Sequence, residues 1–287
     1  MLRQYIQTLA AELDQAGIKN AAREAEWIVE QVAGVTRESI WLKPEQALNK
    51  EQQSTVREFI ERRKTGEPLQ YILGTVEFCG VCLNTGPGVL IPRPETEQLT
   101  MLALEYYPRD GKICDVCTGS GAIAIALSHK LSEERGLTPD ILGVDISSVA
   151  LEYARENIAK NKTFNVSVLE SDLLTELPGN SSFSLVCANP PYVSNKEYAD
   201  LPPDVREYEP RQALAAGEDG LDFIRRLLPQ VSAVLDGDTG VFLCEVGELH
   251  ADRCLQVALD AGFANAGIEK DYAGRPRFLI AEKPTCA

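Results

Sequence analysis

Histidine occurs only twice in this 287-residue chain, and its scarcity limits the metal sites that the chain can build. Two CxxC pairs, Cys79/Cys82 and Cys114/Cys117, have the local spacing of zinc ligands. The gap between the pairs exceeds that of a zinc ribbon, and both histidines are distant from them in sequence. We therefore expect reduced thiols that are buried as small hydrophobic side chains, and no structural metal.

Long apolar runs are also absent. The longest, AIAIAL from Ala122, is far too short to cross a bilayer. Glu12 and Asp14 lie where a signal peptide would need an unbroken apolar stretch. The sequence therefore predicts a soluble, cytoplasmic protein that does not insert into membranes.

Positive charge is scarce, and the deficit is uneven. The formal net charge is −15. Residues 1–75 hold ten basic side chains against eleven acidic ones, whereas residues 76–287 hold 18 against 32. Neutralising phosphates supplies most non-specific affinity for nucleic acids, and an acidic body repels them. We expect no direct binding of nucleic acid.

The residue pattern of the sequence changes along the chain. From Leu2 to about Arg63, apolar residues recur at helical spacing without β-branched alternation. From Gly66 to Pro94, β-prone runs such as YILGTVEF alternate with glycine and proline, which predicts a hairpin and linker rather than more helix. We expect a helical domain at 1–75, a hairpin linker at 76–94 and a second domain at 95–287.

Beyond Lys112, short apolar runs alternate with amphipathic helical stretches, a pattern typical of a parallel α/β sheet. The predicted strands are KICDVC, ILGVDI, VSVLES, FSLVCANP and GVFLCEVG. The last two runs, AGIEKDY and RFLIAEK, predict a closing β-hairpin. In such sheets ligands bind beyond the carboxyl ends of the strands, so each strand end is a candidate site.

The first strand end, DVCTGSG, contains glycines that let the backbone approach a ligand closely. Extended to Ala124 it also fits the dinucleotide pattern G-x-G-x-x-A, so the loop alone names no cofactor. Asp115 favours S-adenosylmethionine, because a carboxylate suits its amino group and repels a pyrophosphate. Alternatively, Asp115 braces the loop by accepting backbone N–H bonds. The candidate cofactor-binding residues here are Asp115, Cys117, Thr118, Gly119, Ser120 and Gly121.

The next two strand ends also carry candidate cofactor-binding residues. At Asp145 a carboxylate can accept hydrogen bonds from both ribose hydroxyls of an adenosine cofactor. Its alternative role is to cap the following helix, which Ser147 can also do. Asp172 and Leu173 lie where an adenine edge is expected, although ordinary turn residues would look the same.

The fourth strand ends in CANPPYV, with Asn189, Pro190, Pro191 and Tyr192. At average residue usage, this tetrapeptide arises by chance in a chain of this length only on the order of once in a thousand. Because it also falls at a strand end, we interpret it as part of the site. The alternative is a rigid Pro-Pro turn with asparagine as a turn former.

The chemistry of this tetrapeptide suits methyl transfer to an amide. Amide nitrogen is a poor nucleophile, and transfer from a sulfonium places positive charge on it, so acceptors must meet its N–H groups. Asn189 offers a side-chain oxygen, while Pro190 and Pro191 offer carbonyls whose direction is fixed by φ of about −65°. Tyr192 packs against the amide or closes the pocket. Positioning and electrostatics then suffice, without an obligatory general base.

Four further stretches accompany NPPY: EPLQYILGTVEFCG, LIPRPETE, GVDIS and DYAGRPR. In this order they make the chain resemble, over nearly its whole length, the HemK/PrmC family of protein-glutamine N5-methyltransferases, which modify peptide-chain release factors. NPPY alone is shared with DNA adenine methyltransferases, so its companions make the resemblance specific. The resemblance implies a Rossmann-like class I methyltransferase: a seven-stranded α/β sheet with a small N-terminal helical domain joined by a β-hairpin linker.

The resemblance also implies the partners of the site. The cofactor is S-adenosylmethionine, with S-adenosylhomocysteine as product, and the acceptor is the glutamine of the Gly-Gly-Gln tip of a class I release factor. Asn189, Pro190 and Tyr192 are the implied catalytic residues, Asn189 also meets the cofactor, and Pro191 and Arg93 join them in contacting substrate. Arg93 otherwise braces the pocket or is a solvated surface arginine. We expect the protein to act as a monomer.

One position departs from the family pattern. The glycine loop of the family usually begins with glycine, whereas this chain has Cys117. A small thiol fits there provided that the backbone does not require a positive φ. We expect the cysteine at position 117 to affect the affinity for the cofactor.

Three other functions remain open from the sequence. NPPY chemistry equally permits N6-methylation of adenine in nucleic acid, against which the acidic body counts. A non-catalytic adaptor would keep the pocket and bind partners through its helical domain. The pattern G-x-G-x-x-A permits a nicotinamide dehydrogenase.

Overall fold

A computed structural model describes residues 2–42, 47–237, 239–263 and 265–283. The chain forms two compact units. The helical unit comprises residues 1–75 and a short segment, 203–208, from much later in the sequence; the sheet unit comprises 76–202 and 209–287. The sequence did not predict that the later segment joins the helices. Among the described residues, no helix has both the length and the apolar character needed to cross a bilayer.

The helical unit packs one apolar stripe from each of its longer helices into a shared core. Leu9, Ile28 and Ile60 are fully buried there, on three different helices. Arg63 forms a buried ion pair with Glu24 at 2.6 Å. Tyr208 of the later segment donates a hydrogen bond to the carbonyl of Thr65 at 3.1 Å. The helices are α1 (Leu2–Gln15), α2 (Ala21–Ala33), α3 (Arg37–Leu42), α4 (Lys50–Lys64), α5 (Leu69–Leu73) and α10 (Pro203–Tyr208).

Helix α5 corrects one prediction. We expected the run YILGTVEF to contribute only β structure, yet its first residues complete a helical turn that begins at Leu69. Pro68 precedes this turn, and Gly74 ends it in the left-handed conformation with φ 74°. Proline at the start and glycine just past the end are helix boundary signals, which we had interpreted as turn signals.

The predicted hairpin and seven-stranded sheet are confirmed. Strands β1 (Thr75–Phe78) and β2 (Val81–Asn84) form the hairpin. The sheet has the order β5-β4-β3-β6-β7-β9-β8, in which β9 runs antiparallel to both of its neighbours. Its strands are β3 (Ile113–Val116), β4 (Ile141–Asp145), β5 (Val166–Glu170), β6 (Leu185–Ala188), β7 (Val241–Glu245), β8 (Asn265–Lys270) and β9 (Pro276–Glu282).

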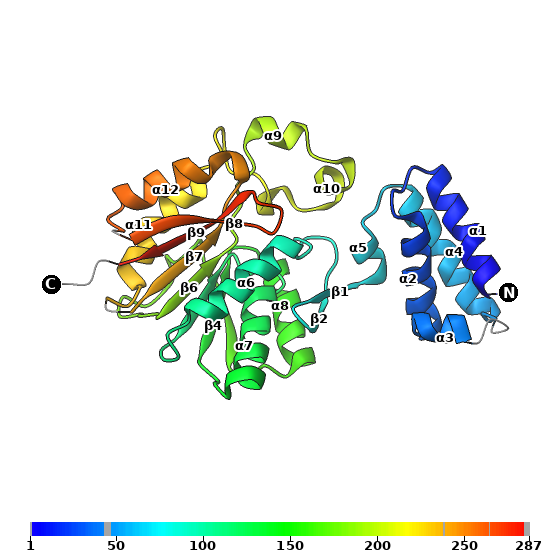
Figure 1. The fold of residues 1–287 in the computed structure, drawn as a ribbon, viewed down its shortest axis with the longest axis horizontal. Helices are drawn as coiled ribbons and strands as arrows, with labels where there is room; N and C mark the ends of the chain where they lie inside the picture. Colours follow the sequence, from blue (N-terminus) through cyan, green and yellow to red (C-terminus); the bar gives the residue numbers. More distant parts are fainter. Residues whose placement is uncertain (1, 43–46, 238, 264, 284–287) are drawn as a thin grey trace. The chain divides into compact units, whose positions relative to one another are not determined.

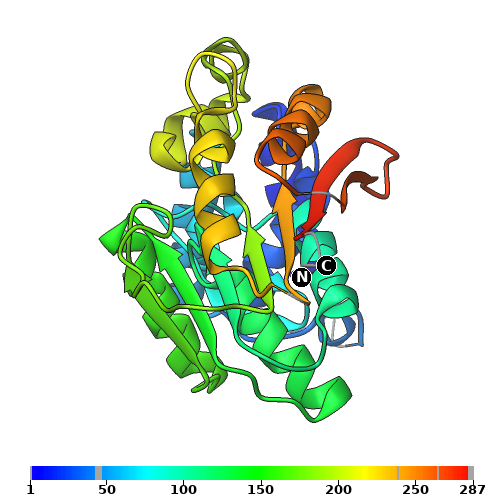
Figure 2. The same ribbon diagram turned by 90° about the vertical axis from the view of Figure 1, so that its left-hand side faces the viewer.

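Helices cover both faces of the sheet (Figures 1 and 2). One face packs against α6 and α7 through residues such as Leu99 and Leu127, and the other against α11 and α12 through Leu227 and Cys254. Strands β3 and β6 are buried at every position, as expected of strands covered on both faces. The helices of this unit are α6 (Pro94–Tyr106), α7 (Ala122–Arg135), α8 (Ser148–Asn161), α9 (Asn195–Ala199), α11 (Asp222–Val234) and α12 (Ala251–Asp260), with short 3₁₀ turns η1 (Arg211–Ala213) and η2 (Glu248–His250).

Asn157 joins the hairpin to the glycine loop. Asn157 of α8 is fully buried, and its Oδ1 accepts the backbone N–H of Asn84 at 2.6 Å. Its Nδ2 donates to the carbonyls of Asn84 and Ser120, both at 3.0 Å. One side chain therefore satisfies backbone groups of both the hairpin and the glycine loop.

We expect Asn157→Ala to lower the free energy of unfolding by about 2 kcal/mol or more, because it leaves buried backbone groups unpaired. Urea unfolding followed by circular dichroism measures this change. Glu152→Ala, at an exposed position on the same helix, is the matched control and should stay within about 0.5 kcal/mol of the parent. Equal stability of the two variants would contradict the bracing role of Asn157.

Candidate active site

The register of three parallel strands brings the predicted site residues to one edge of the sheet. Val116 of β3 lies opposite Val144 of β4 on one side and Ala188 of β6 on the other. The next residue of each strand's continuation is Cys117, Asp145 and Asn189, respectively. These three residues are far apart in sequence, yet the ladder sets them at the same level.

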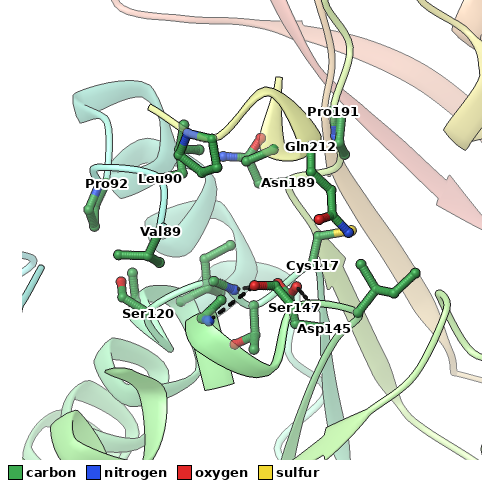
Figure 3. Close-up of a pocket in the computed structure, with 18 of the residues that line it drawn as sticks. Val89, Leu90, Pro92, Cys117, Ser120, Asp145, Ser147, Asn189, Pro191 and Gln212 are labelled. Atoms are coloured by element: carbon green, nitrogen blue, oxygen red, sulfur yellow. Dashed lines mark hydrogen bonds between the residues drawn. The ribbon is translucent and has the colours of Figure 1, made fainter. Parts of the chain in front are cut away.

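A cavity of about 190 Å³ opens at this edge. Figure 3 shows Asn189 and Pro191 on one side of it and Asp145 on the other. Of the candidate residues, Cys117, Thr118, Gly119, Ser120, Asp145, Asp172, Asn189 and Pro191 line the cavity. The remaining candidates are not among its lining residues: Asp115, Gly121, Leu173, Pro190, Tyr192 and Arg93.

Asp145 fixes the glycine loop through hydrogen bonds to backbone N–H groups. Its Oδ2 accepts the N–H of Gly119 at 2.9 Å, and its Oδ1 accepts the N–H of Ser147 at 2.9 Å. Ser147 caps α8 by accepting the N–H of Ala150, so the helix-capping role does not require Asp145. Burial raises the pKa of Asp145, against the effect of its backbone hydrogen bonds. Each oxygen retains a lone pair with which to accept a hydroxyl of a bound ligand.

Asp115 lies beneath the loop and is fully buried. Its Oδ2 accepts hydrogen bonds from the hydroxyl of Thr118 at 2.6 Å and from the N–H of Ala124 at 3.2 Å, which is the bracing geometry we considered as an alternative. Its Oδ1 has no hydrogen-bond partner in the described part of the chain. Burial raises the pKa of Asp115 to about 7, although its two hydrogen bonds act in the opposite direction.

The loop carries backbone strain where the sequence departs from the family pattern. Cys117 has φ 58°, in the left-handed region that favours glycine. The condition under which a thiol fits without strain is therefore not met. Leu173, at the end of the third predicted strand, has φ 56° and is also strained.

Asn189 is oriented by residues that the sequence analysis did not single out. Its Nδ2 donates to the hydroxyl of Thr96 at 3.1 Å, and this hydroxyl donates to Oε2 of Glu245 at 2.7 Å. The hydroxyl of Tyr192 donates to Oε1 of the same carboxylate at 3.1 Å. Glu245 is 1% exposed, and an acidic residue within the apolar run GVFLCEVG was the one sequence signal that pointed to it.

Two segments distant in sequence form the remaining walls. Val89, Leu90 and Pro92 come from the stretch before α6, while Pro210, Gln212 and Ala213 come from the stretch after α10. Glu209 joins the two segments by accepting hydrogen bonds from the N–H of Ile91 and from the guanidinium of Arg93. This pairing fits the bracing role, one of the three roles that we left open for Arg93.

Gln212 was also not singled out from the sequence. In Figure 3 its side chain points toward Cys117, opposite Asp145. Two backbone hydrogen bonds hold the segment that carries Gln212 against the end of the NPPY segment. The N–H of Val193 donates to the carbonyl of Leu214 at 2.9 Å, and the N–H of Ala216 donates to the carbonyl of Val193 at 2.8 Å.

The cysteines fall into two groups. Cys114, Cys187, Cys244 and Cys254 are buried, as expected, whereas Cys79, Cys82 and Cys117 are only half-buried. The seven cysteines among the described residues are all unpaired. Within the described residues, no cluster of three or more potential ligands that could hold a metal is found; the absence of a structural metal stays a prediction.

Comparisons with known proteins agree with this geometry. The chain matches the PrmC N-terminal domain over residues 4–74 and the methyltransferase small domain over residues 95–201. It is 35% identical to a release factor glutamine methyltransferase of Geobacter sulfurreducens, over 97% of this chain and 95% of the relative. It is 38% identical to one of Thermodesulfovibrio yellowstonii, over 91% of this chain and 92% of the relative.

A solved structure supports the fold. A 16S rRNA N2 G1207 methyltransferase of T. thermophilus, in complex with AdoMet and guanosine, is 16% identical and has a TM-score of 0.54. The match covers 73% of this chain and 50% of that chain. At this identity the likeness speaks for the fold alone.

The buried Asp115 gives a prediction about pH. The pKa of Asp115 is higher in the folded chain than the value of 3.8 expected when unfolded. Its contribution to the stability of the fold is therefore fully present below pH 3.8. The contribution falls as pH rises toward 7, by about 4 kcal/mol at most. Asp115→Asn removes the titration, so its stability relative to the parent should increase between about pH 5 and pH 8. Urea unfolding at several pH values measures this difference, and Glu152→Gln is the exposed control. Parallel stability curves for Asp115→Asn and the parent would contradict the prediction.

The strained cysteine gives a second prediction. We expect Cys117→Gly to stabilise the fold by about 0.5–1 kcal/mol, because relief of strain outweighs the added freedom of the unfolded chain. Cys117→Val should destabilise it, since a β-branched side chain tolerates positive φ poorly. Urea midpoints compare these variants. Cys114→Gly, within strand β3, is the contrasting control and should lose stability; if Cys117→Gly loses as much, the strain at Cys117 is not relieved by glycine.

Proposed function

This chain belongs to the release factor glutamine methyltransferase family, and from that premise we propose that it transfers a methyl group from S-adenosylmethionine to the side-chain amide nitrogen of the glutamine in the Gly-Gly-Gln segment of peptide-chain release factors. The observation that carries the proposal is the orientation of Asn189. Its NH₂ group is held by Thr96, which leaves Oδ1 to accept a hydrogen bond at the cavity.

Glutamine is favoured over adenine as the acceptor. Both present an NH₂ group attached to a planar carbon, and the NPPY geometry alone accommodates either. The relatives that match nearly the whole chain, including its N-terminal helices, are named as glutamine methyltransferases. The net charge of −15 also opposes binding to nucleic acid.

Residues that line the cavity, together with the buried Asp115 behind them, fit an adenosine cofactor that carries a charged amino group. Asp145 has lone pairs available for hydroxyl groups, and the unpartnered Oδ1 of Asp115 is an acceptor suited to an ammonium. Ser120 lines the cavity, and its hydroxyl is likewise without a partner in the described chain. We propose that these residues, together with Thr118, Gly119 and Asp172, hold S-adenosylmethionine. When bound, the cofactor supplies an electrophilic methyl group on a positively charged sulfur.

The protein's own contribution is to place the acceptor amide and stabilise its developing charge. Methyl transfer would form an N–CH₃ bond and break an S–CH₃ bond, so that positive charge would pass to the acceptor nitrogen. Oδ1 of Asn189 accepts one N–H of the amide, and we propose that the carbonyl of Pro190 accepts the other. The nitrogen then releases a proton to solvent, which returns it to a neutral, N-methylated amide.

The walls of the cavity indicate how water is excluded. Val89, Leu90, Pro92 and Pro191 surround it with apolar surface. Hydrogen bonds to the amide are stronger in such surroundings than in water. We propose that the helical unit recognises the release factor. We also propose that the protein acts as a monomer, in the cytoplasm where release factors work.

The test of this function uses the whole chain, a purified release factor and methyl-labelled S-adenosylmethionine. We expect one methyl group on the glutamine of the Gly-Gly-Gln segment, located by peptide mass spectrometry. Asn189→Ala should slow the transfer by roughly a hundredfold or more, because it removes an acceptor that strengthens its interaction in the transition state. The proposal is wrong if the parent protein places no label on that glutamine.

Asp145→Ala separates binding from catalysis. It should weaken cofactor binding, measured by calorimetry, since a contact made before and during the reaction affects affinity. Asn189→Ala should have the smaller effect on cofactor affinity and the larger effect on kcat at saturating cofactor. The reverse pattern would contradict the assigned roles.

A further inference from the structure

A buried carboxylate braces both ends of the NPPY segment. Glu245 ends strand β7, and its two oxygens accept from two different hydroxyls. One belongs to Tyr192, the last residue of the segment, and the other to Thr96, which in turn meets Asn189, the first residue. Glu245 and Thr96 are 1% and 4% exposed, so the hydrogen bond between them is shielded from water, whereas the bonds to Asn189 and Tyr192 are partly buried.

The donors and acceptors of this hydrogen-bond network determine which way the side-chain amide of Asn189 faces. A threonine hydroxyl has one hydrogen, and Thr96 donates it to Glu245 at 2.7 Å. Toward Asn189, 3.1 Å away, the same oxygen can then only accept. The group of Asn189 that faces Thr96 is therefore its NH₂ group, and Oδ1 occupies the opposite branch of the amide.

The opposite orientation of the Asn189 amide would be unfavourable for two reasons. Its Oδ1 would meet the lone pairs of Thr96, whose hydrogen is engaged by Glu245. Its NH₂ group would meet the N–H groups of the acceptor glutamine, donor against donor. Both contacts would leave a polar group unpaired in a shielded site, which is unfavourable.

We propose that Thr96 and Glu245 are positioning residues, which lock the Asn189 amide with its oxygen toward the acceptor glutamine and thereby select an NH₂ donor as substrate. The inference rests on the proposed function and adds residues that act through Asn189. It also explains the fully buried acidic side chain at the end of an apolar strand.

Near-isosteric variants test the lock. Thr96→Val removes the hydroxyl, so Asn189 is free to turn. Glu245→Gln does more, because a glutamine NH₂ group can donate to Thr96, whose own hydrogen then points to Asn189 and favours the unproductive orientation. We expect kcat for release-factor methylation to fall about tenfold or more in each, by analogy with the loss of one preorganised transition-state contact. The KM for the release factor and the Kd for S-adenosylmethionine should stay within about threefold.

Two further variants separate positioning from a merely structural role. Thr96→Ser keeps the hydroxyl and should restore most of the kcat lost in Thr96→Val. Thr100→Val is the matched control: Thr100 is also fully buried on α6, one turn later, but its hydroxyl donates to the backbone carbonyl of Thr96 at 2.9 Å. It should leave kcat unchanged. The proposal is overturned if Thr96→Val retains parental kcat, or if Thr96→Ser and Thr100→Val lose kcat as much as Thr96→Val does.

A measurement without turnover keeps this inference distinct from the proposed function. In ¹⁵N NMR of the whole chain, the side-chain NH₂ signal of Asn189, identified by its loss in Asn189→Ala, reports the hydrogen bond to Thr96. Its hydrogen exchange should be faster in Thr96→Val than in the parent and unchanged in Thr100→Val. If the hydrogen exchange of the Asn189 NH₂ group is unchanged in Thr96→Val, Thr96 does not fix the orientation of Asn189. If the exchange changes as expected but the parent methylates no release factor, the proposed function fails while the orientation of Asn189 stands.

Discussion

The parallel pairing of β3 with β4 and β6 is the constraint on which the site depends. In a parallel ladder every strand ends at the same edge, so residues separated by tens of positions in the chain arrive side by side without any contact between their own side chains. Here the ladder sets the glycine loop, Asp145 and Asn189 at one level. The sheet is buried on both faces, and this rigidity fixes a carboxylate and a carboxamide on either side of one cavity.

Polar groups that the ladder cannot place are held by hydrogen bonds between distant segments. Thr96 and Glu245 orient Asn189, Asn157 joins the hairpin to the glycine loop, and Glu209 joins the two segments that form the far walls. Each of these side chains is buried. A buried polar side chain with several partners admits few arrangements, because breaking one bond leaves a group unpaired.

This division explains what the sequence could predict. The strand-end rule located Asp145 and Asn189, since it depends on local apolar runs and on a general property of α/β sheets. Thr96 and Glu245 were missed because their role depends on a contact across 149 positions, which no local pattern encodes. Helix α5 was missed for the opposite reason: proline and glycine mark both helix ends and turns, and a five-residue helix has too few apolar positions to show a period.

The segment 203–208 lies within the sequence of the sheet unit but packs with the helices. The polypeptide therefore passes between the two units three times, after residues 75, 202 and 208. Exchanging the N-terminal helices for those of a relative by a single splice at Thr75 would replace Thr65 but keep Tyr208, and so divide a hydrogen-bonded pair of the helical unit. A chimera that keeps the helical unit of this chain whole must therefore be spliced at all three passages.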